Sequence, residues 1–275
     1  MGLLRDALLE VAAAARPATC RQIFYRMVSV GAIEKTEAGY QNVVIRLLGE
    51  LRRDGALPYE WIADSTRWMR KPTTYSGLDH ALMRSARSYR RALWDTAGGY
   101  VEVWCEKEAL AGVIVDVTDH WDVPLLVTRG YPSLSYLHAA AETIAAQERP
   151  CYLYHLGDLD PSGTDIDRCI ESGIRELAPA AEIHFERIAV LHHQVEEFSL
   201  LTRPTKRSDT RAANYEHDYS VEVDAIDPTD LRELVEGAIL QHLDWAELGR
   251  LRVIEAEERR TLATIAANFS ANEPG

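Results

Sequence analysis

Two aspartates stand two positions apart in the stretch HLGDLDPSG, residues 155–163, after an apolar run and before a Pro-Ser-Gly turn. Side chains at this spacing point to the same side of an extended chain, so Asp158 and Asp160 can converge on one ion. Glu106 follows another apolar run and could supply a third carboxylate. Carboxylate oxygens are the ligands of Mg²⁺, which keeps waters for a phosphate. A solvated turn, built from the same residue types, is the alternative.

A tyrosine and an arginine one helical turn apart form a second candidate, in TCRQIFYRMV at residues 19–28. On a helical wheel Tyr25 falls about 130° from the apolar stripe, on the side expected to be exposed. Arg21 precedes it by four residues, so guanidinium and phenol share a face. A neighbouring cation helps a phenol to ionise, which favours a tyrosine nucleophile. An ordinary surface tyrosine beside an arginine is the alternative.

Two basic residues follow predicted strand ends and could hold a phosphate. They are Lys107 and Arg129, and solvated loop charges are the other interpretation. Asp165 and Asp167 repeat the spacing of two. They fall in a predicted helix, however, where alternate side chains diverge.

The carboxylates need a sheet to bring them together, and residues 100–190 have the pattern of one. Strand-like runs alternate with helix-like runs, which predicts an α/β fold with a parallel sheet flanked by helices. Ligands bind at the carboxyl ends of such strands, where Glu106, Asp158 and Asp160 would lie. The predicted strands are 100–106, 124–130, 151–158 and 182–190, and the predicted helices are 107–121, 134–147 and 163–177.

The N-terminal part predicts three helices and then a short aromatic, basic segment. Thr19 and Gln22 form a capping-box pattern at the start of the second helix, and the third covers 38–54. Helices followed by an aromatic hairpin are typical of a winged helix, whose recognition helix enters the major groove of DNA. The expected phosphate contacts are Arg46 and Arg53 on the recognition helix and Arg67, Arg70 and Lys71 on the wing.

The charge distribution divides the chain at Gly98 and Gly99. Residues 1–95 carry 15 Lys+Arg against 10 Asp+Glu, a balance of +5, whereas residues 96–275 carry 15 against 33, a balance of −18. A net charge of −13 alone disfavours nucleic acid. A basic part joined to an acidic remainder nevertheless indicates a DNA-binding module, with a chance fluctuation as the alternative. The predicted domains are 1–95 and 99–275, the second ending in an acidic helical extension.

Cysteine usage and hydropathy bear on the compartment. The four cysteines show neither CxxC nor zinc-ligand spacing, so we expect reduced thiols. No uncharged apolar run approaches the roughly 18 residues that a membrane span needs. We therefore expect a cytoplasmic, nucleoid-associated protein with no membrane partner.

The motifs in the sheet region also resemble a known family. Glu106-Lys107, then TRGYPS at 128–133, then GDLDPSG at 157–163 resemble the toprim domain of the topoisomerase VI A-subunit family. That family includes the meiotic transesterase that makes double-strand breaks. RQIFY, residues 21–25, resembles its Arg-x-Ile-aromatic-Tyr motif in a winged-helix domain. The chain is closest in length to the compact "mini" A-like members, and the resemblance covers roughly residues 15–200.

The resemblance implies a function. Tyr25 would attack a phosphodiester of double-stranded DNA, leaving a 5′-phosphotyrosyl bond and a 3′-hydroxyl, while Arg21 stabilises the developing charge. Mg²⁺ held by Glu106, Asp158 and Asp160 would orient the phosphate. A homodimer is implied, because the tyrosine of one protomer works with the metal site of the other. Strand passage would need a separate ATPase partner resembling the B subunit.

Two other functions stay open at this point. A toprim nuclease would use a metal-activated water, with Tyr25 incidental to the reaction. A non-catalytic winged-helix DNA-binding protein would use its acidic sheet only for dimerisation or metal-dependent stability.

Overall fold

A computed structural model describes residues 2–63, 72–205 and 215–271, and its contacts divide the chain into two compact units. The first unit consists of residues 1–67 and 98–241, and the second of residues 68–97 and 242–275. The domain boundary predicted near Gly98 lies where the chain passes from the second unit back to the first, between residues 97 and 98. Residues 68–97, however, group with the C-terminal helix and not with the N-terminal helices.

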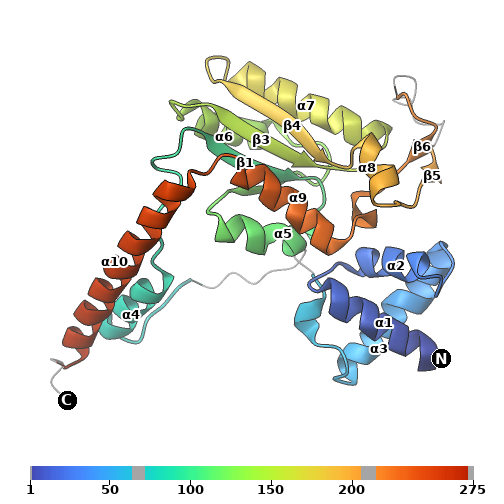
Figure 1. The fold of residues 1–275 in the computed structure, drawn as a ribbon, viewed down its shortest axis with the longest axis horizontal. Coiled ribbons are helices and arrows are strands. Elements are labelled where there is room, and N and C mark those ends of the chain that lie inside the picture. Colours follow the sequence, from blue (N-terminus) through green and yellow to red (C-terminus); the bar gives the residue numbers. More distant parts are fainter. Residues whose placement is uncertain (1, 64–71, 206–214, 272–275) are drawn as a thin grey trace. The chain divides into compact units, whose positions relative to one another are not determined.

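The first unit contains a four-stranded parallel sheet with the strand order β2-β1-β3-β4, as the alternating pattern predicted. Helices α6 and α7 pack together on one face, and α5 and α9 pack together on the other (Figure 1). The strands are β1 Tyr100–Cys105, β2 Leu125–Val127, β3 Cys151–Leu156 and β4 Ile183–Ala189. The helices are α5 Glu108–His120, α6 Leu134–Ala145, α7 Pro161–Leu177, α8 His192–Glu197 and α9 Pro228–Leu240.

The register of the two central strands decides where the site forms. Almost all residues of β1 and β3 are buried, as expected for strands covered by helices on both faces. Cys105 pairs with Leu156 at the last step of this ladder. The residues that follow each strand therefore leave the sheet at the same edge.

The N-terminal helices surround an apolar core of their own, and the predicted capping box of Thr19 and Gln22 is present. The predicted third helix is also present, although its first part is wound as a π-helix. The core includes Leu8, Ile23, Met27, Leu47 and Leu48. The elements are α1 Gly2–Ala15, α2 Cys20–Ser29, η1 Gly39–Ile45 and α3 Arg46–Arg53.

Part of the predicted aromatic hairpin lies outside the described residues. Arg67, Arg70 and Lys71, the predicted phosphate contacts of the wing, are in that part. Its described beginning is a 3₁₀ turn, η2 Tyr59–Trp61, followed by an isolated parallel bridge between Ile62 and Ala18. This stretch therefore closes the N-terminal core, because it pairs with the chain ahead of α2.

The second unit pairs α4 Leu78–Ser88 with α10 Trp245–Ala271, which lie side by side (Figure 1). The Tyr89 hydroxyl donates to Glu258 at 2.7 Å, and Arg259 donates to the Tyr89 carbonyl at 2.7 Å. These contacts hold the end of α4 to α10.

The first unit also contains three short elements, which are β5 Arg203–Pro204, β6 Tyr219–Ser220 and η4 Val223–Ala225. The four cysteines, all within the described residues, form no disulfide. No helix in the described ranges has the length and apolarity needed to cross a membrane.

Candidate active site

The three predicted carboxylates lie where parallel strands end. Glu106 follows β1 directly, and the Asp158 N–H, two residues beyond β3, donates to Glu106 Oε2 at 3.2 Å. Asp160 is the N-cap of α7, and its side chain accepts from the Gly163 N–H at 2.8 Å. The strand ends thus bring Glu106 and Asp158 into contact and place Asp160 at the start of the next helix.

Glu106 and Asp158 are crowded, and the pKa values of these two side chains are both raised. Burial raises the pKa of Glu106, and the charges of Asp158 and Asp160 raise it further. Burial also raises the pKa of Asp158, against the opposing effect of Lys107. A bound cation would relieve this repulsion, and carboxylate oxygens are the ligand type that a hard divalent ion accepts.

Lys107 supplies a positive charge from the chain itself. Its Nζ lies 2.8 Å from Asp158 Oδ1 and 2.7 Å from Asp224 Oδ2, and the Val223 N–H also donates to Asp158 Oδ1 at 2.9 Å. Burial opposes the charge on Lys107, but Asp224 and Asp158 raise its pKa. Within the described residues, no three His, Cys, Asp or Glu side chains are grouped so that they could hold a metal ion.

Two further carboxylates, those of Glu222 and Asp224, lie beside Lys107, and the sequence did not lead us to predict them. Glu222 accepts two hydrogen bonds from Arg21, both at 3.0 Å, and one from Arg203 at 3.0 Å. Its Oε2 lies 4.0 Å from Lys107 Nζ. The detectable signal was the alternation Val-Glu-Val-Asp at residues 221–224, which is typical of a half-buried strand with both acids on one side.

Tyr25 is buried, with 4 % of its surface exposed, so the prediction of an exposed tyrosine was wrong. The face of α2 that the helical wheel left open is covered by η4, which the chain reaches almost 200 residues later. Arg21 does lie beside Tyr25, with its guanidinium carbon 5.9 Å from the ring centroid.

The expected activation of this phenol is reversed. Burial raises the pKa of Tyr25 to about 12, and Glu222 adds to the rise, while Arg21 opposes it. Glu222 carries a full negative charge next to both side chains, because its own pKa is about 2. The carboxylate therefore offsets the guanidinium charge that was expected to favour the phenolate.

The other predicted phosphate contacts differ in their surroundings. Lys107 belongs to the buried cluster, so it is not a solvated loop charge. Arg129 is exposed, has a positive φ of 54° and forms an ion pair with Glu108. Arg46 is half-exposed and pairs with Glu50 at 2.7 Å, and Arg53 is exposed at the end of α3.

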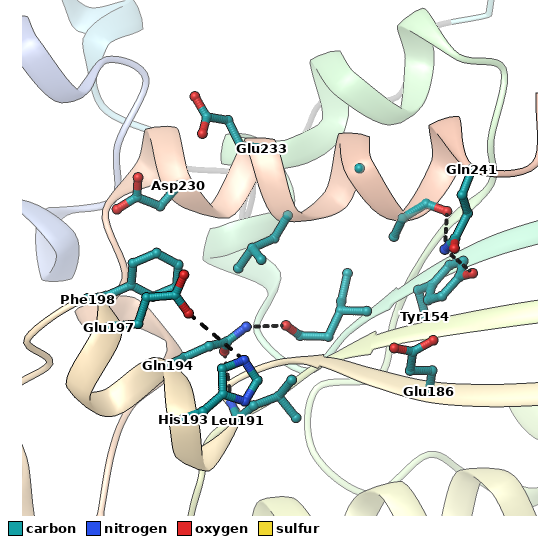
Figure 2. Close-up of a pocket in the computed structure, with 14 residues that line it drawn as sticks. Tyr154, Glu186, Leu191, His193, Gln194, Glu197, Phe198, Asp230, Glu233 and Gln241 are labelled. Carbon is teal, nitrogen blue, oxygen red and sulfur yellow. Dashed lines mark hydrogen bonds and ion pairs between the residues drawn. The ribbon is translucent and has the colours of Figure 1, made fainter.

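A separate cavity of about 600 Å³ lies between β4, α8 and α9 (Figure 2). Its lining combines apolar side chains with four carboxylates, and none of the predicted site residues belongs to it. The apolar residues include Ile188, Leu191, Phe198 and Leu234, and the carboxylates are those of Glu186, Glu197, Asp230 and Glu233. This cavity is therefore distinct from the charged cluster at the strand ends.

The charge state of Glu222 leads to a prediction about acid stability. Because its pKa is lowered to about 2, its contribution to folding is complete above the ordinary glutamate pKa of about 4.3 and is lost as the pH falls towards about 2. We expect Glu222→Gln to be less stable than wild type at neutral pH, with the difference shrinking across this window. Urea unfolding at a series of pH values measures it, and a constant difference would contradict it.

A close approach at Gly163 leads to a second prediction. A Cβ on Gly163 would lie 2.1 Å from the Asp158 carbonyl oxygen, so Gly163→Ala must push α7 away from the Asp158 segment. We expect a loss of about 1–3 kcal/mol in the free energy of unfolding. Gly173→Ala in the same helix is the control, because its Cβ would meet only the flexible end of Leu137. Equal stability of the two variants in urea would contradict this.

Comparisons with known proteins give no family for this chain: no family model matches it, and no curated protein is a significant match.

Proposed function

We propose that the protein cleaves double-stranded DNA by Mg²⁺-dependent transesterification, as a compact relative of the topoisomerase VI A subunit. In this proposal the N-terminal helices form a winged-helix module and the parallel sheet is a toprim domain. One observation supports it above all. Arg21 of α2 is bonded to Glu222, which lies next to Lys107, which in turn pairs with Asp158. The candidate nucleophile helix and the carboxylates thus belong to one charged cluster.

In the proposed reaction, Tyr25 Oη forms a bond to phosphorus and the bond to the 3′-oxygen breaks. The phenol loses one proton and the departing oxygen gains one, so the products are a 5′-phosphotyrosyl bond and a 3′-hydroxyl. Arg21 donates to the phosphate oxygens as negative charge develops on them. Glu106, Asp158 and Asp160 would hold Mg²⁺, which supplies positive charge that orients the phosphate.

Binding DNA requires Arg21 to exchange partners. Both of its described hydrogen bonds go to Glu222, so a phosphate has to compete with that carboxylate for the guanidinium. Moving the guanidinium towards a phosphate leaves the charge of Glu222 beside Tyr25 without its partner, and that charge raises the pKa of the phenol. The proposal therefore assigns ionisation of the nucleophile to the positive charge that Mg²⁺ would supply. In this proposal Tyr25 acts with the carboxylates of its own chain, whereas the resemblance implies that it acts with those of a second protomer. The homodimer, the separate ATPase partner resembling the B subunit and the location at the nucleoid in the cytoplasm are kept from the resemblance.

A toprim nuclease is the second candidate, and the burial of Tyr25 favours it. A phenol that is 4 % exposed, with a pKa of about 12, is a poor nucleophile in the arrangement described. In this alternative an activated water cleaves the DNA and the products carry free ends.

Detergent-quenched cleavage separates these functions. DNA labelled at its ends is incubated with protein and Mg²⁺ and quenched with detergent, and the label is then followed. Label that stays with protein supports the transesterase, whereas free 5′-phosphate ends support the nuclease. DNA binding without any cleavage contradicts both and favours a non-catalytic DNA-binding protein.

The arginines of α3 lead to a prediction about DNA binding. If Arg46 and Arg53 contact phosphates, replacing both with alanine should lower the salt slope of binding by about two units. Arg168→Ala, which removes an exposed arginine of α7, is the matched control. An unchanged slope in the double variant would show that the DNA follows another path.

A further inference from the structure

A group of three interacting polar side chains lies close to the strand ends. Arg187 of β4 donates through Nε to Asp167 Oδ2 at 2.5 Å, and Asp167 Oδ1 lies 2.5 Å from Nδ1 of the fully buried His155. The side chains of Arg187 and Asp167 are 11 % and 17 % exposed. The three residues come from β4, α7 and β3, so the group ties three elements together.

Arg187 also bonds the chain segment that carries the first candidate carboxylate. Its Nη1 donates to the Gly157 carbonyl at 2.7 Å and to the Asp158 carbonyl at 3.1 Å. A guanidinium is rigid and planar, so fixing its Nε on a carboxylate also fixes the direction in which Nη1 points. Asp167 therefore orients Arg187, and Arg187 holds the main chain at residues 157–158.

The same guanidinium borders Glu106 across Gly157. A Cβ on Gly157 would lie 3.0 Å from Glu106 Oε2 and 3.4 Å from Arg187 Nη2. The glycine thus leaves room for the Glu106 carboxylate and the guanidinium to approach one backbone position. A shift of Arg187 would reach both Glu106 and Asp158, since these two are joined by the Asp158 N–H.

We propose that Asp167 and Arg187 are positioning residues, which set the relative geometry of Glu106 and Asp158 for a divalent cation. That a cation binds here rests on the proposed function. The hydrogen bonds from Arg187 to the carbonyls of residues 157 and 158 do not depend on it. Replacing a residue that contacts and orients a metal ligand commonly lowers metal affinity or activity by about 10–100-fold.

The chain contains a matched control for this role. Asp165 and Asp167 have the same spacing as Asp158 and Asp160, but on α7 they diverge, as predicted. Asp165 lies towards the surface, where it accepts from the Tyr131 hydroxyl at 2.7 Å and pairs with Arg168. Asp167 bonds to Arg187, which in turn bonds to the segment that carries Asp158.

The test compares Arg187→Lys and Asp167→Asn with Asp165→Asn in the full chain. Mn²⁺ binding is measured by electron paramagnetic resonance without DNA, and hydrogen exchange is followed in peptides covering residues 155–160. Circular dichroism checks the fold. Lysine keeps the positive charge but lacks the planar guanidinium with its several fixed N–H donors. We therefore expect Arg187→Lys to weaken Mn²⁺ binding by about 10–100-fold and to speed hydrogen exchange in residues 155–160. Asp165→Asn should match wild type in both measurements.

Each outcome decides the proposal. A folded Arg187→Lys with wild-type Mn²⁺ affinity and exchange would overturn it. If wild type binds no Mn²⁺, the proposed metal site fails, and the exchange measurement alone then decides the positioning role. If Arg187→Lys does not fold, Asp167→Asn decides by the same measurements, because amide and carboxylate have the same shape. Failure of both to fold would assign the pair to the core and overturn the proposal.

Discussion

Tyr25→Phe should retain the fold and the affinity for DNA and should form no covalent protein–DNA adduct. Phenylalanine keeps the ring, which packs edge-to-face on Phe24 at 5.5 Å between centroids and lies 5.2 Å from Lys35 Nζ. Only the phenolic oxygen is lost. A missing adduct in a folded variant therefore reports on the chemistry of that oxygen and not on packing.

Tyr40→Phe is the matched control for this variant. Tyr40 lies in the same surroundings, with the Arg21 guanidinium carbon 4.8 Å from its ring centroid, and burial raises its pKa too. If the adduct depends on Tyr25 alone, Tyr40→Phe should still form it. Loss of the adduct in both variants would point to the cluster as a whole and would contradict the assignment to Tyr25.

The pH dependence of adduct formation adds a second measurement. Because the pKa of Tyr25 is about 12, only a small fraction of the phenol is ionised near neutral pH. The rate should rise with pH from about 7 to about 9 without a plateau, since the phenolate is the reactive form. Undiminished cleavage by Tyr25→Phe, with free 5′-phosphate ends, would refute the transesterase and favour the nuclease.

The sheet could be predicted from the sequence because its signal is local. Apolar runs such as CYLYHL alternate with helical runs, and a parallel sheet then requires that Glu106 and Asp158 leave it at one edge. The cap at Thr19 was equally local, since Gln22 stands three residues away. Such features depend on neighbours in the chain, which the sequence displays directly.

The surroundings of Tyr25 could not be predicted in this way. A helical wheel shows which side of α2 is less apolar, but not that η4 returns to cover it. Glu222 and Asp224 were not predicted as members of the cluster for the same reason. Their partners in it, Arg21 and Lys107, lie more than 100 residues away in the sequence. The pairing of α4 with α10 has the same origin, since helical periodicity does not identify a helix's partner.

The last prediction concerns Asp158, whose loss should remove Mg²⁺-dependent cleavage and also lower stability. Crowding of carboxylates alone predicts the opposite for stability, because removing one of them relieves repulsion. Asp158 Oδ1, however, accepts the Val223 N–H at 2.9 Å and pairs with Lys107, and the residue is 9 % exposed. Asp158→Ala leaves a buried N–H without its acceptor, at a cost of about 1–3 kcal/mol.

Asp158→Asn separates the two roles of this side chain. The amide oxygen can still accept the Val223 N–H, and Lys107 keeps its 2.7 Å contact with Asp224. The amide lacks the negative charge that a cation requires. We therefore expect Asp158→Asn to lie closer to wild type than Asp158→Ala in urea unfolding, and both to lack Mg²⁺-dependent cleavage. Full cleavage by either variant would remove Asp158 from the metal site. Equal stability of Asp158→Ala and wild type would mean that relief of carboxylate repulsion outweighs the lost hydrogen bond.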